Sequence, residues 1–150
     1  MHAHAPASRP VVALHGLAAA LTAVMGILYL ARDRIMPYHL DALQTTWAAL
    51  GPAYQALFVA FIKGVGAGYL AAGVAMLIMV ALPLRRGERW PLWTLPLVTA
   101  LCMVPLAGII LHIRASTPAE PPLVFPLVVL GVSAAGVVAS LLTGRGRAAG

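Results

Sequence analysis

Seven polar residues near the ends of long apolar stretches are the only group in this sequence that suggests a binding site. They come from three separate parts of the chain: Asp33, His39, Asp41, Lys63, His112, Arg114 and Glu120. Such side chains could form a mouth or a lipid-headgroup pocket, with Lys63 as its deepest charge. The alternative is that the basic side chains extend to water and pair with nearby carboxylates merely to complete the bundle. The alternative is favoured, because boundary charges are common in membrane proteins.

The residues needed for catalysis or for a metal site are missing from the sequence. It has no Ser-His-acid triad, glycine-rich phosphate loop or metal-ligand spacing. Cys102 is the single cysteine, which excludes thiol-disulfide chemistry because that chemistry needs a pair. The first apolar stretch has no carboxylate for proton-coupled antiport. We therefore predict no catalytic residue and no metal, and favour a protein that is not an enzyme.

The placement of the histidines argues against heme. His15 lies near the start of the first apolar stretch, whereas His112 lies near the end of the third. If both stretches span the bilayer, about 20 Å of it separates these two residues. One heme iron cannot take both as axial ligands. No cofactor is predicted, and the purified protein is expected to be colourless.

Four long apolar stretches must position the polar residues. They cover residues 11–30, 57–84, 91–113 and 123–142, and Lys63 is the only charge in any of them. Each reaches the ~20 residues that a membrane-spanning helix needs. The chain is 61% apolar and 9% charged, whereas soluble domains are about 25% charged. These features predict one domain over residues 1–150, an all-α integral membrane four-helix bundle, with flexible tails at 1–9 and 144–150.

The connection between the first two spans, residues 31–51, has a helical pattern of its own. Its apolar residues recur at steps of three and four: Leu40, Leu43, Trp47 and Leu50. This stripe predicts a short amphipathic helix at the membrane interface, where the Trp47 ring would lie at headgroup depth. A loop folded onto the bundle would use the same residues and is the less favoured alternative.

Small and polar residues predict which helix faces are buried. The inward faces expected for the first and fourth spans are formed by His15, Ala18, Ala19, Thr22, Met25 and Tyr29, and by Ser133, Gly136, Ser140 and Thr143. Two stripes with small residues at every fourth position allow close approach of helices: Gly64, Gly68 and Ala72, and Gly131, Ala135 and Ala139. Packing of these stripes within the chain is favoured over packing between chains.

The arginines indicate the orientation in the membrane. Arg9, Arg85, Arg86, Arg89, Arg145 and Arg147 belong to one side, and Arg32, Arg34 and Arg114 to the other. The positive-inside rule then places both termini in the cytoplasm of a bacterium, with the protein in its inner membrane. The net charge of +6 comes from span ends and not from a basic face, so nucleic acid is not an expected partner.

Some segments resemble a known group of proteins. They are Gly26–Leu30, the run Met36–His39, the glycine-rich segment Lys63–Gly73 and the polar segment Arg85–Trp90. Together they resemble the small bacterial four-helix membrane proteins of the DoxX-like type, over roughly residues 11–142. The resemblance implies a four-helix fold and ties to respiratory or quinone-linked complexes. It implies no catalytic residue.

These observations predict a small accessory or lipophile-binding bundle without catalytic chemistry of its own. Its expected partners are the lipid bilayer, a lipophilic molecule or quinone, and another membrane protein or a second copy. Two alternatives stay open. One is an obligate subunit of a larger respiratory or other membrane complex, and the other is an enzyme or transporter that uses the polar cluster around Lys63.

Overall fold

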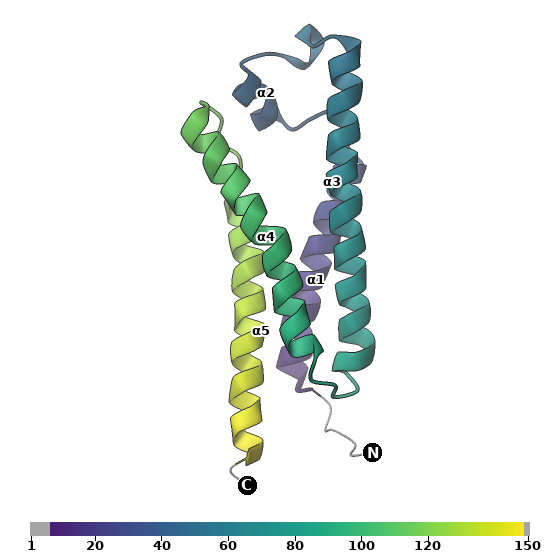
Figure 1. Ribbon diagram of the computed structural model, residues 1–150, viewed down its shortest axis with the longest axis vertical. Helices are drawn as coiled ribbons and strands as arrows, with labels where there is room; N and C mark the ends of the chain where they lie inside the picture. The colour runs from purple at the N-terminus through teal and green to yellow at the C-terminus, as the bar shows by residue number, and fades with distance from the viewer. Residues whose placement is uncertain (1–6, 149–150) are drawn as a thin grey trace.

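The computed structural model describes residues 7–148, and this part of the chain is helical without strands (Figure 1). The long helices are α1 (Arg9–Leu30), α3 (Pro52–Met79), α4 (Pro91–Ser116) and α5 (Val124–Ala148). A π-helical turn, η2 (Val80–Leu84), extends α3. Four helical segments are long and apolar enough to cross a membrane. The predicted all-α membrane bundle is therefore confirmed.

The two ends of the bundle differ in structure. We call the end with the start of α1 and the 85–90 connection the basal end, and the end with α2 (Pro37–Leu43) the apical end. In Figure 1, α3 and α4 approach each other at the basal end and diverge toward the apical end, where α2 lies between them. Helix α1 packs mainly against α3 and α5, and α4 packs mainly against α5. The α3–α4 side of the bundle is thus the least tightly packed.

Glycines bring the backbones of α1 and α3 into contact. A Cβ added at Gly26 would lie 2.7 Å from the Gly66 carbonyl oxygen, and one added at Gly73 would lie 2.7 Å from the Ala23 Cα. No side chain fits in such a gap, so only glycine permits this approach. The predicted inward face of α1 is confirmed at its centre, since His15, Ala18, Ala19 and Thr22 are all buried.

The two predicted small-residue stripes do not make this contact. Added Cβ atoms at Gly64, Gly68 and Gly131 would meet nothing within 4 Å, and Ala135 is exposed. The expectation that these stripes pack within the chain is therefore wrong for these four positions. Gly66 and Gly73 lie on another face of α3, where regular spacing of small residues gives no clear signal but the α1 backbone is close.

Helix α3 changes its hydrogen-bonding pattern where it ends. Pro83 lies inside the π-helical turn η2. Proline has no N–H and its ring clashes with the preceding turn of an α-helix, so a wider turn relieves the clash. Gly87 then adopts a positive φ of 84°, which lets the chain reverse into α4.

The predicted interfacial helix is shorter than its apolar stripe. Helix α2 ends at Leu43, because Gln44 takes the left-handed conformation with a φ of 50°. A separate 3₁₀ turn, η1 (Trp47–Ala49), begins after Thr46, whose hydroxyl accepts a hydrogen bond from the Ala49 N–H at 3.3 Å. Trp47 and Leu50 therefore belong to a second element. Thr46 explains the break, since threonine favours helix starts over helix interiors.

The predicted flexible tails, residues 1–9 and 144–150, fall only partly outside the described residues. Residues 1–6 and 149–150 are not described. Helix α5 continues to Ala148, so residues 144–148 are helical.

Candidate functional site

Helix α2 is held against the apical end of α1 by a pair of tyrosines. The hydroxyl groups of Tyr29 and Tyr38 are 3.2 Å apart and form a hydrogen bond. Burial is the main cause that raises the pKa of the Tyr38 phenol, and the hydrogen bond with Tyr29 adds to it. Tyr38 therefore stays neutral and able to donate at any physiological pH.

An apolar groove lies between α2 and α3. It has a volume of about 300 Å³, and we call it the α2 groove. Its lining is Ile35, His39, Ala42, Leu43, Phe58, Phe61 and Ile62. The side chains of Leu43 and Phe61 are 46% and 60% exposed, so the groove opens to the surroundings of the bundle. This size lies at the lower limit of ligand sites, which hold about 300–1,000 Å³.

His39 is the only polar residue that lines the α2 groove, and its protonation follows from its hydrogen bond. Its Nδ1 accepts a hydrogen bond from the Met36 backbone N–H at 3.3 Å. An acceptor nitrogen carries no proton, so the neutral ring must carry its proton on Nε2. Burial lowers the pKa of His39 and so favours this neutral form. His39 can therefore offer one N–H donor to a ligand.

A smaller cavity lies on the other side of α2. Its volume is about 60 Å³, and it lies between α1, α2, α4 and the connection before α5. Tyr29, Tyr38 and His39 are its polar lining, and the rest is apolar, including Ile110 and Pro121. The space would hold a water molecule or two, but not a ring-containing ligand. His39 thus lines hollows on both sides of α2.

Arg114 binds the connection between α4 and α5. Its Nε and one terminal nitrogen donate hydrogen bonds of 3.0 and 2.8 Å to the Pro121 carbonyl oxygen. This contact joins the end of α4 to the segment before α5. Glu120 and His112 are exposed near it.

The other predicted site residues are not gathered in one place. Asp33 is exposed in the turn after α1, and Asp41 is exposed on α2, beside a shallow hollow that Gln44 and Pro118 also line. Lys63 is partly buried on α3. Among residues 7–148, no carboxylate oxygen lies within 4.0 Å of the Lys63 nitrogen. Of the seven predicted residues, only His39 lines the α2 groove, and a binding role for the other six stays a prediction.

Sequence reasoning did not identify the residues that surround His39. Tyr29 was expected to face inward, but its hydrogen bond to Tyr38 was not predicted. The two residues are nine positions apart, and the turn between them follows no periodic pattern. Phe58 and Phe61 are ordinary members of an apolar helix by composition. The only available signal was their position, since α3 is longer than a membrane crossing requires and these residues lie in the excess.

Two further polar side chains are buried deep in the bundle. His15 is 1% exposed and Ser133 is 3% exposed. Within the described residues, His15 Nε2 and Ser133 Oγ have no hydrogen-bond partner. Gly136 makes room for the imidazole, since an added Cβ there would lie 2.9 Å from His15 Cε1. Buried polar atoms of this kind are usually satisfied by ordered water.

Comparison with known proteins does not add to this description. No family model, no characterised protein and no solved structure matches the chain. The functional argument therefore depends on the geometry of the bundle itself, which is that of a multi-pass membrane protein with a groove at its apical end.

Proposed function

We propose that the protein binds a lipophilic molecule whose polar head carries a carbonyl oxygen, with a quinone as the leading candidate. The observation that carries the proposal is the α2 groove, whose apolar lining includes one hydrogen-bond donor, His39. The Nε2–H group of His39 would donate to the carbonyl oxygen. Apolar parts of the ligand would pack against Phe58, Phe61 and Ile62, which replace the lipid tails that the ligand leaves.

The location of the α2 groove suits a ligand that arrives from the bilayer. About 20 residues counted along the α3–η2 segment from Leu84 reach Lys63, so the groove lies near the membrane boundary. The Phe61 side chain lines the groove and is exposed on the outside of the bundle, so a lipophile could enter the groove sideways from the bilayer. The function is then accessory, since the protein would hold or present the molecule without changing it. The DoxX-like resemblance and its respiratory ties agree with this proposal.

A binding measurement tests the proposal directly. The probe is a benzoquinone with a decyl tail, added to the purified protein in detergent while tryptophan fluorescence is recorded. Trp47 is close to α2 in sequence and should be quenched. His39→Phe should weaken binding about fivefold, because one hydrogen bond contributes about 1 kcal/mol. Ala42→Phe should fill the groove and abolish binding without adding a tryptophan to the fluorescence signal.

A matched control separates the groove from nonspecific partitioning. His112 is exposed outside the groove, so His112→Phe makes the same change and should leave the affinity unaltered. Equal weakening by both histidine variants, or undiminished binding by Ala42→Phe, would contradict the proposal.

The exposed glycines support a second candidate, a subunit of a larger membrane complex. Gly64 and Gly68 lie on one face of α3 with no atom near their added Cβ positions. Such a face allows close approach of a helix from another protein. If a partner binds there, Gly68→Leu should prevent its co-purification in mild detergent, whereas Leu101→Phe on exposed α4 should not.

A further inference from the structure

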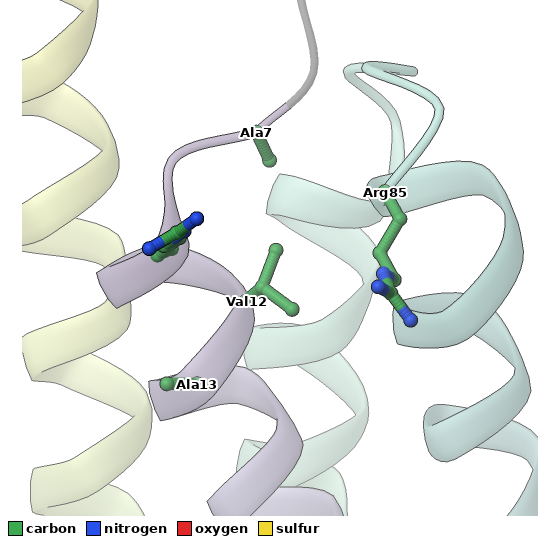
Figure 2. A pocket seen from close by; sticks show the side chains of 5 residues that line it. Ala7, Val12, Ala13 and Arg85 are labelled. Carbon is green, nitrogen blue, oxygen red and sulfur yellow. The ribbon is translucent and has the colours of Figure 1, made fainter.

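A pocket at the basal end combines two arginines with an apolar floor. It has a volume of about 380 Å³ and is lined by Ala7, Arg9, Val12, Ala13 and Arg85. Figure 2 shows Ala7, Val12 and Ala13 on α1 and the segment leading into it, with Arg85 across the opening at the end of the α3–η2 segment. The two arginines come from distant parts of the chain, so only the folded bundle brings them to one pocket.

The positive charge of this pocket is not neutralised by the described part of the chain. Among residues 7–148, no carboxylate oxygen lies within 4.0 Å of Arg9 or Arg85. The first turn of α1 contains no acidic residue. Glu88 is the acidic residue closest in sequence to Arg85, and its Oε2 instead accepts a hydrogen bond from Trp90 Nε1 at 2.6 Å. An anion from outside the chain can therefore bind without displacing a carboxylate of residues 7–148.

The depth of the pocket points to phosphate chemistry. Trp90 and Trp93 are 48% and 67% exposed at the same end of the bundle, and exposed tryptophans of membrane proteins concentrate at headgroup level. Guanidinium groups bind phosphate oxygens through paired N–H donors. Val12 and Ala13 provide apolar surface beneath the arginines, which suits the glycerol and upper acyl carbons of a lipid and offers nothing to a free ion.

We propose that this basal pocket binds the phosphate group of an anionic phospholipid, held between Arg9 and Arg85 with its acyl chains along α1. The site is separate from the α2 groove and does not depend on the function proposed for it. A bound lipid would bridge α1 and α3 at the end where η2 interrupts regular helical hydrogen bonding.

The test uses the full chain in nanodiscs of phosphatidylcholine doped with phosphatidylglycerol, and measures the lipid retained on extraction by native mass spectrometry. Wild-type protein should retain phosphatidylglycerol in preference to phosphatidylcholine. The double variant Arg9→Gln, Arg85→Gln should lower this preference about tenfold, because each basic residue near anionic lipid strengthens binding severalfold. Arg86→Gln, Arg89→Gln removes the same charge from exposed arginines that do not line the pocket, and should retain the preference.

Two further arms complete the experiment. Ala13→Phe fills the pocket without changing charge and should also lower retention, which covers the case in which the arginine variant is poorly folded. Inorganic phosphate at millimolar concentration should not displace the lipid, and displacement would assign the site to a soluble phosphate. Equal losses in the two double variants, or no preference in the wild type, would overturn the proposal.

Discussion

At the scale of single residues, glycine decides which faces of this bundle can touch. Gly66 and Gly73 are buried against α1, whereas Gly68 on the same helix is exposed with open space around it. The same substitution therefore meets opposite surroundings at positions five residues apart. This contrast offers a clean test of the α1–α3 interface.

We expect Gly73→Ala to destabilise the bundle by about 1–3 kcal/mol, the usual cost of overpacking. Its new Cβ would clash with the Ala23 backbone, which cannot move aside as a flexible side chain could. Gly68→Ala should be neutral or slightly stabilising, because alanine favours helix by about 1 kcal/mol. Unfolding in mixed micelles with increasing denaturing detergent measures both. Equal stabilities for the two variants would contradict the α1–α3 contact.

His15 and Gly136 form a second residue-scale pair. Gly136→Ala would press a Cβ against a fully buried ring and should cost about 1–3 kcal/mol. In a His15→Ala background the ring is absent, so the same change should cost much less. A double-mutant cycle measures the difference as a coupling energy. A coupling near zero would show that the imidazole does not face Gly136.

At the scale of elements, α2 is the piece whose stability should depend on pH. Its start is capped by the Met36 N–H donating to His39 Nδ1, and a protonated imidazole cannot accept this bond. The Tyr29–Tyr38 hydrogen bond ties α2 to the long helix α1. His39 and Tyr38, the α2 residues in these two hydrogen bonds, both line the small cavity between α1, α2 and α4.

Acid should loosen α2 in a defined pH range. The pKa of His39 is lowered from 6.5 in the docked state because burial disfavours the imidazolium, so the undocked state binds the extra proton. Docking should be fully stable above pH 6.5, weaken as pH falls toward the lowered pKa, and change no further below it. Hydrogen exchange of the α2 amides as a function of pH measures the stability of docking. The quinone affinity, measured over the same pH range, should fall with it.

Two substitutions check the source of that pH dependence. His39→Gln should remove it, since glutamine does not titrate. His112→Gln, at an exposed position, should leave it intact. A pH response that persists in His39→Gln would show that another group controls α2.

At the scale of the whole molecule, the bundle places its arginines unequally. The start of α1 and the 85–90 connection bring four arginines to the basal end, and α5 also ends there. The apical end carries Arg32 and Arg34 in the connection after α1, and Arg114 in the last turn of α4. With the two arginines after Thr143, the ratio is six to three, and from this ratio the positive-inside rule predicts a cytoplasmic basal end.

Reporter fusions test this orientation. An enzyme that is active only outside the cytoplasm should be silent after Gly150 and active when inserted after Ser116, because an odd number of membrane crossings separates the two points. Reversed activities would place the basal end outside. They would also move the proposed lipid site to the other leaflet without altering its chemistry.

The membrane class, the four long helices and much of the inward face of α1 could be predicted from local sequence patterns alone. These features depend on local properties, namely the number of consecutive apolar residues and the helical repeat, which act before any helix meets another. His15 and Thr22 could be placed inward for the same reason, since a polar side chain in a span avoids lipid.

Three features could not be predicted in this way: which glycines touch another helix, how α2 ends and which residues surround His39. Gly64 and Gly66 are only two positions apart on α3. An added Cβ would meet the α1 backbone at Gly66 and open space at Gly64, so the difference depends on where the α1 backbone lies. The α2 groove is likewise lined by residues 35–43 and residues 58–62, which the turn at Gln44 and the 3₁₀ turn η1 separate in the sequence. Contacts of this kind depend on the relative position of whole helices, which small differences in packing determine and no local pattern encodes.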